Sequence, residues 1–151
     1  MENKSSIAIL CFLGLFVIAQ GLTFKYEDLE QYYKCWTYSN CVSDEAAQKI
    51  EDCLKILKPD ELKSTFQYVE DNYYKYKNDD LPDAVKEYCN DYDDETKHDA
   101  YDKTLNGVLT YEKKLCGEDK AGECSRLGQT IGCVFSYLDV LKQEGKCKTD
   151  N

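Results

Sequence analysis

The sequence predicts an all-α protein, an irregular bundle of five or six short helices stapled by four disulfides. Apolar residues recur at intervals of three and four along most of the chain, which is the period of an α-helix. No stretch alternates apolar and polar residues over more than four positions, so no sheet is expected. Eight of the nine cysteines follow an N-terminal segment typical of exported proteins.

That N-terminal segment has the features of a secretory signal peptide. Residues 7–19 form an unbroken apolar run, shorter than the roughly 20 residues that a membrane-spanning helix needs. Ala19 and Gly21 are small residues that suit a cleavage site directly after them. We therefore expect residues 1–21 to be removed and residues 22–151 to form a single secreted domain without a transmembrane segment.

The cysteines predict a disulfide framework. Cys11 lies in the signal segment, and an even set of eight remains in a chain that passes through an oxidising compartment. A zinc site is poorly supported, because no C-x-x-C pair occurs and the chain has a single histidine. The spacing leaves the pairing open among Cys35, Cys41, Cys53, Cys89, Cys116, Cys124, Cys133 and Cys147.

Two short helices are expected in the first part of the domain. Thr23 caps the first, whose apolar positions are Tyr26, Leu29, Tyr33 and Trp36. Ser43 begins the second, because serine caps helix N-termini and two acidic residues follow it. One face of that second helix carries Ala46, Ile50, Cys53 and Leu57.

The next helix begins at Pro59 and has a regular apolar stripe. Proline is tolerated in the first turn of a helix, and the two acidic residues after it suit the positive end of the helix dipole. The stripe consists of Leu62, Phe66, Val69, Tyr73 and Tyr76. A short helix is then expected to start at Pro82 and to run through Val85 and Cys89.

Two further helices complete the expected bundle. One runs from about Asp94 to Cys116 and stops at Gly117, with Gly107 as a weak point in its middle. Its inward positions are Tyr101, Leu105 and Val108. The last helix ends at Gly145 and carries a stripe of Leu127, Ile131, Val134, Leu138 and Leu141.

Cys124 and Cys133 lie in this last helix and cannot bond to each other. Nine steps of about 100° place them on opposite sides of the helix and ~13.5 Å apart along its axis. We therefore expect each cysteine to pair with a different element, and the last helix to be an inner element of the bundle.

The composition narrows the classes of function. The 19 basic and 29 acidic residues give a net charge of −10, which repels nucleic acid and anionic lipid surfaces. A Ser-His-Asp or Cys-His catalytic set would need His98, the only histidine, which lies in a polar run typical of a solvated surface. We expect no enzymatic activity, no cofactor, and neither nucleic acid nor membrane as a partner.

The acidic segment from residue 91 to residue 102 offers a calcium alternative. Acids stand at positions one, three, five, nine and twelve of an EF-hand-like loop: Asp91, Asp93, Glu95, Asp99 and Asp102. The sixth position is Thr96 instead of glycine, and the last ligand is the shorter aspartate instead of glutamate. A solvated acidic loop followed by the start of a helix is the favoured interpretation.

Thirteen tyrosines also require an explanation. Packing at the edge of the core is the favoured one, because tyrosine buries its ring while its hydroxyl stays hydrated. Adjacent pairs such as Tyr73 and Tyr74 cannot all point inward on a helix. We therefore also expect some exposed tyrosines, which would suit a binding surface.

The spacing Cys124-x8-Cys133 in an acidic, helical, exported chain resembles the last-but-one helix of insect odorant-binding proteins. The resemblance implies a helical disulfide bundle around an apolar pocket for small volatile ligands. That family usually carries an earlier C-x3-C pair, where this chain has Cys35-x5-Cys41. The Tyr- and Asp-rich body and the segment from Cys133 to Cys147 are also similar to secreted cysteine-rich helical proteins of arachnid venom glands, haemolymph and nematode extracellular fluids.

Two functions stay open at this point. The leading hypothesis is a secreted, non-enzymatic effector or interaction protein, such as a venom or gland component that binds an extracellular protein target. The alternative is an extracellular carrier of a small hydrophobic ligand, although a filled core explains the same apolar positions more simply. Its candidate lining is Phe66, Val69, Leu105, Val108, Leu127, Ile131, Val134 and Leu138. The sequence leaves the oligomeric state open.

Overall fold

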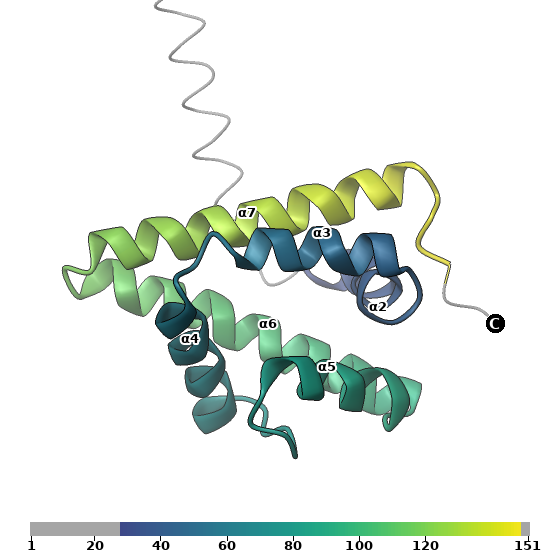
Figure 1. The fold of residues 1–151 in the computed structure, drawn as a ribbon, viewed down its shortest axis with the longest axis horizontal. Coiled ribbons are helices and arrows are strands. Elements are labelled where there is room, and N and C mark those ends of the chain that lie inside the picture. The colour runs from purple at the N-terminus through teal and green to yellow at the C-terminus, as the bar shows by residue number, and fades with distance from the viewer. Residues whose placement is uncertain (1–27, 149–151) are drawn as a thin grey trace, which may run out of the picture.

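The computed structural model describes residues 28–148, and within this range the chain forms six α-helices and no strand (Figure 1). The elements are η2 (Glu30–Tyr32), α2 (Tyr33–Cys41), α3 (Asp44–Leu54), α4 (Pro59–Asn72), α5 (Leu81–Asn90), α6 (Asp94–Gly117) and α7 (Ala121–Gln143). The predicted all-α class is confirmed. Two of the helices are long instead of short, since α6 has 24 residues and α7 has 23. The predicted signal segment, the Thr23 cap and Tyr26 lie outside the described residues.

Helices α6 and α7 form a long hairpin, and the shorter helices pack around it (Figure 1). Helices α2 and α3 lie against α7, whereas α4 and α5 lie against α6. Helix α7 contacts η2, α2, α3 and α6, but its other face, which carries Val140, is exposed, so the prediction that it is an inner element of the bundle is not confirmed. None of the helices in residues 28–148 is long and apolar enough to cross a bilayer.

The helix ends follow local signals in the sequence. Ser43 Oγ accepts the N–H of Ala46 at 3.1 Å, which confirms the predicted cap of α3. Pro59 is the first residue of α4, as expected, and α5 begins one residue before Pro82. After α7, Gly145 adopts a positive φ of 67°, a conformation that glycine reaches without steric cost.

Two expected helix limits are displaced by a few residues. Helix α3 ends at Leu54, so Leu57 lies beyond it, although its side chain is buried. Gly117 is the last residue of α6 instead of its stop, and the left-handed conformation in the following turn belongs to Asp119, with a φ of 59°. Aspartate enters this region more readily than most residues, so the turn does not need the glycine.

The expected apolar stripe of α4 is wrong at its end, because the helix stops at Asn72. The N–H groups of Tyr73 and Tyr74 both donate to the carbonyl of Val69, at 2.8 and 3.0 Å, which closes the last turn. Tyr76 then lies in the connection to α5 and is buried there. The connection is held by a residue of the next helix, which the periodicity of α4 cannot reveal.

That residue is Glu87 on α5. Its carboxylate accepts the backbone N–H groups of Lys77 at 3.0 Å and of Asn78 at 3.2 Å, and also the hydroxyl of Tyr92. Burial by itself would raise the pKa of Glu87, but these hydrogen bonds hold the pKa below its usual value. Glu87 is therefore a buried carboxylate that stabilises the turn in its charged form.

Four disulfides fasten the bundle, as predicted. They are Cys35–Cys147 between α2 and the C-terminal tail, Cys41–Cys89 between α2 and α5, Cys53–Cys133 between α3 and α7, and Cys116–Cys124 between α6 and α7. Cys124 and Cys133 thus bond to different helices, which confirms the geometric expectation. Helix α4 is the one described α-helix that carries no disulfide.

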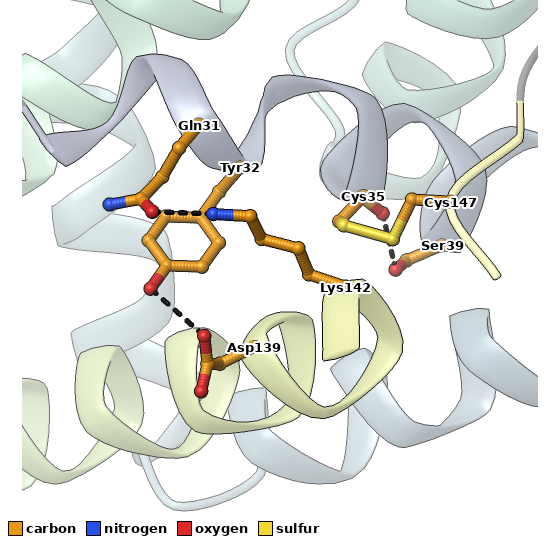
Figure 2. Close-up of a disulfide and its surroundings, with 7 residues drawn as sticks. All are labelled: Gln31, Tyr32, Cys35, Ser39, Asp139, Lys142 and Cys147. Atoms are coloured by element: carbon orange, nitrogen blue, oxygen red, sulfur yellow. Dashed lines mark hydrogen bonds between the residues drawn. A yellow bond between two sulfur atoms is a disulfide. The ribbon is translucent and has the colours of Figure 1, made fainter. Parts of the chain in front are cut away.

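Polar contacts near the Cys35–Cys147 bridge hold the start of the domain against the end of α7 (Figure 2). The hydroxyl of Tyr32 donates to Asp139 at 3.4 Å. Lys142 donates to the side-chain oxygen of Gln31 at 2.6 Å, and its ammonium group lies 5.5 Å from the centre of the Tyr32 ring. These contacts and the disulfide anchor both ends of the described chain to one side of the bundle.

Candidate ligand-binding cavity

An apolar cavity of about 150 Å³ lies between helices α2 to α7. Every one of these six helices contributes to its wall, and no lysine, arginine, histidine, aspartate or glutamate does. A dry cavity of ~150 Å³ with aliphatic and aromatic walls is large enough to hold a molecule of the size of benzene. The feature is therefore a cavity of ligand size and not a packing defect below the size of a water molecule.

Seven of the eight candidate lining residues meet in the wall of this cavity. They are Phe66, Val69, Leu105, Val108, Leu127, Ile131 and Val134. The eighth, Leu138, does not line the cavity; it is fully buried in the core that surrounds it. Sequence reasoning missed the contributions of α2, α3 and α5, among them Trp36, Ile50, Leu54, Ala84 and Val85. Their apolar positions were visible in the sequence, but nothing local indicated that these helices share a hollow with α4, α6 and α7.

Helix α4 supplies four wall residues, Leu62, Thr65, Phe66 and Val69, and lies very close to α6. The close approach depends on Gly107, because a Cβ atom there would lie 3.0 Å from Cγ2 of Val69 and 3.1 Å from the ring of Tyr73. The hydroxyl of Tyr73 donates to Thr110 of α6 at 2.9 Å. The glycine that looked like a weak point of α6 therefore makes room for a wall of the cavity.

The N-terminal end of α4 is tied to α7 by a partly buried ion pair. The Nε atom of Arg126 donates to both carboxylate oxygens of Glu61, at 3.0 and 2.9 Å, and its Nη2 donates to one of them. Glu61 also accepts the backbone N–H of Lys58 at 3.0 Å. The guanidinium and this N–H hold the pKa of Glu61 at about 2, well below its ordinary value of 4.5. Helix α4 has no disulfide, so this non-covalent contact has the anchoring role that disulfides have for the other helices.

Few polar groups line the cavity, and most of them are already bonded. The hydroxyls of Thr65 and Thr130 donate to carbonyls of their own helices, at 2.8 and 2.9 Å. The hydroxyls of Tyr76 and Thr104 bond to each other at 2.8 Å. Burial raises the pKa of Tyr76 to about 12, so this phenol stays neutral at physiological pH.

The expectation of exposed tyrosines is wrong within residues 28–148, where every tyrosine is at least partly buried. The expectation assumed that residues 73–76 are helical, whereas α4 ends before them. The tyrosine rings pack on one another instead, as Tyr74 does on Tyr76, with ring centres 4.8 Å apart. Tyr74 and Tyr76 meet edge to face, whereas Tyr68 and Tyr111 stack with ring centres 4.7 Å apart. The tyrosines are thus packing residues, as the favoured interpretation predicted.

The acidic segment does not form an EF-hand-like loop. Helix α6 begins at Asp94, so Glu95, Asp99 and Asp102 lie along a helix and cannot wrap around one ion. Asp93 caps that helix, and Asp99 pairs with Lys103 at 2.8 Å. Among the residues that the structure describes, no group of three or more His, Cys, Asp or Glu side chains is placed to hold a metal.

His98 lies near the surface at the start of α6. Its Nε2 atom is 2.7 Å from a carboxylate oxygen of Glu30, and its ring packs at a tilt against Tyr33 with centres 4.4 Å apart. These contacts join α6 to the first elements of the described chain.

Comparison of the chain with protein-family models, with curated proteins and with solved structures finds no match. The two resemblances from the sequence thus hold at the level of a small, all-helical, disulfide-rich fold.

Proposed function

We propose that this protein is a non-enzymatic carrier that holds a small apolar ligand in the cavity between its helices. The observation that carries the proposal is the cavity itself, with a volume of about 150 Å³ and an uncharged wall. Small-molecule sites are typically concave and mostly apolar, with a few placed polar groups. This wall has that character, and all six helices of the described chain contribute to it.

We further propose that the carrier acts outside the cell. Four disulfides fit an oxidising compartment, and the signal-peptide pattern of residues 1–21 fits export.

The competing hypothesis, a secreted effector that binds a protein target, has less support. It drew on exposed tyrosines, whereas every tyrosine in residues 28–148 is at least partly buried. The large hydrophobic side chains that are exposed in residues 28–148 are the valines at 42 and 140. They stand on different elements, at the end of α2 and in α7, and do not form a broad apolar surface.

A direct test is a titration with toluene, followed by NMR of isotope-labelled isoleucine methyl groups. Ile50 and Ile131 line the cavity, and Ile56 does not, so one spectrum holds both the reporters and an internal control. We expect saturable shifts at the first two methyl groups and none at the third. Toluene that shifts all three equally, or none of them, would contradict the proposal.

Filling the cavity gives a matched pair of variants. Val134→Phe places a ring in the cavity wall of α7, and Val140→Phe makes the same change on the exposed side of that helix. We expect the first to abolish toluene binding and the second to preserve it. Val108→Phe on α6 fills the cavity from another helix and should reproduce the loss.

A further inference from the structure

The polar groups of the cavity wall differ in whether their hydrogen-bond donors already have a partner. The hydroxyls of Thr65 and Thr130 donate to backbone carbonyls. The amide of Asn40 donates to the carbonyl of Trp36, and Asn40 is only partly buried, so water can bond its other polar atoms.

The other wall hydroxyls, those of Tyr88, Tyr76 and Thr104, each bond to another hydroxyl, and Tyr88 does so with Thr37, which lies outside the wall. Tyr88 bonds to Thr37 at 2.8 Å, and this pair continues to the hydroxyl of Tyr33, which donates to Asp94. That network therefore ends in a carboxylate that accepts its last hydrogen.

The Tyr76–Thr104 pair has no such continuation. Two hydroxyl groups carry two hydrogens, and the bond between them uses one, whichever group is the donor. No acceptor among residues 28–148 receives the second hydrogen. Tyr76 is buried, Thr104 is partly buried, and both residues line the cavity, so one spare donor belongs to the cavity wall. When Thr104 donates within the pair, the spare hydrogen is on the buried Tyr76 hydroxyl, where a donor without a partner is costly, and an acceptor on a ligand would remove that cost.

The charges around the cavity disfavour an anionic ligand. No cationic side chain lines the wall, and the nearby guanidinium of Arg126 is already paired with Glu61. A carboxylate in the cavity would lose its hydration without gaining a counter-ion, and the net charge of −10 would repel it on approach.

We propose that the cavity selects uncharged apolar ligands that carry one hydrogen-bond acceptor, such as a ketone, aldehyde or ester, and that the Tyr76–Thr104 pair donates to this acceptor. The inference rests on the proposed carrier function. It adds a chemical class to that function and identifies the two residues that recognise it.

Three compounds of equal size test this selectivity. Acetophenone has a neutral acceptor, benzoate has a charged one, and α-methylstyrene replaces the ketone oxygen by a carbon. With Ile50 and Ile131 as reporters at pH 7, we expect both neutral compounds to bind and benzoate to bind at least ~100-fold more weakly than acetophenone.

The double variant Tyr76→Phe/Thr104→Val removes both partners of one bond and so leaves no hydroxyl unpaired, which keeps the fold nearly unaffected. Its affinity for acetophenone should fall about 3- to 10-fold, and its affinity for α-methylstyrene should not change. Thr130→Val is the matched control, because it removes a wall hydroxyl that is already bonded to its own helix. It should change neither affinity.

The outcomes separate the two proposals. If no compound shifts Ile50 or Ile131, the carrier function itself fails. If the neutral compounds bind but benzoate binds equally well, or the double variant keeps its full affinity for acetophenone, the carrier stands and the selectivity is refuted. If the double variant does not fold, the comparison of benzoate with acetophenone on the unmodified protein decides.

Discussion

The cavity predicts that Val134→Phe stabilises the protein while it abolishes ligand binding. A closed cavity of about 150 Å³ corresponds to about 3.6 kcal/mol at ~24 cal/mol per Å³, and this is an upper limit here because the cavity is partly open to solvent. The larger side chain adds about four carbon atoms, which are worth about 3 kcal/mol at ~0.8 kcal/mol each when they are fully buried. An imperfect fit of the ring to the wall destabilises the folded protein by ~1–3 kcal/mol. We therefore expect a net gain of about 1 kcal/mol in the free energy of unfolding.

Urea denaturation followed by circular dichroism measures this gain. Val140→Phe, whose site is 48% exposed, should stay within about 0.5 kcal/mol of the unmodified protein. Toluene at about 100 times its dissociation constant should stabilise the unmodified protein by ~2.7 kcal/mol and Val134→Phe not at all. A loss of several kcal/mol in Val134→Phe would mean that the ring finds no free space, and the reasoning from cavity volume would be refuted.

Three further predictions use the same unfolding assay or hydrogen exchange. Replacing Cys53 and Cys133 by alanine should cost ~4.5 kcal/mol, against ~2.5 kcal/mol for Cys116 and Cys124, because the first disulfide spans 80 residues and the second spans 8; the opposite order would contradict the chain-entropy account. The pKa of Glu61 is about 2 in the folded protein and 4.5 ordinarily, so its stabilising effect is complete above about pH 4.5 and is lost as the pH falls toward 2. The stability difference between the unmodified protein and Glu61→Gln should therefore shrink over that range, and a difference that does not depend on pH would disprove the assignment. Amide hydrogens of α4 should exchange faster than those of α7, which two disulfides hold, and equal protection would count against independent opening of α4.

The sequence predicted α7 best because the information for that helix is local. Its apolar stripe, its C-terminal Gly145 and the opposed positions of Cys124 and Cys133 all depend on the geometry of one helix. The pairing of these cysteines with Cys116 and Cys53 depends on where other helices lie, and the spacing left it open.

The errors concern features that distant residues determine. Tyr76 continues the period of α4 in the sequence, but the segment directly after it is held by Glu87, which lies ten residues after Lys77. The role of Gly107 is equally hidden, since only the position of α4 in the fold shows what its missing Cβ avoids. The weaker calcium alternative for the acidic segment fails because Asp93 caps a helix at that point, whereas the favoured interpretation of an acidic loop followed by a helix agrees with the structure.

The candidate site shows the same division between local and distant information. Periodicity identified seven wall residues, because a residue that faces the interior of a helical bundle must face either a filled core or a cavity. The choice between these two depends on how six helices fit together, and the disulfides constrain that fit unevenly.

Covalent links fix α2, α3, α5, α6 and α7, whereas α4 is held by the Glu61–Arg126 ion pair and its contact at Gly107. The cavity is partly open to solvent, and local opening that widens its mouth costs least where no disulfide must be strained. Since α4 also supplies four wall residues, its movement would expose the cavity directly, and the frame of disulfides would keep the rest of the wall in place.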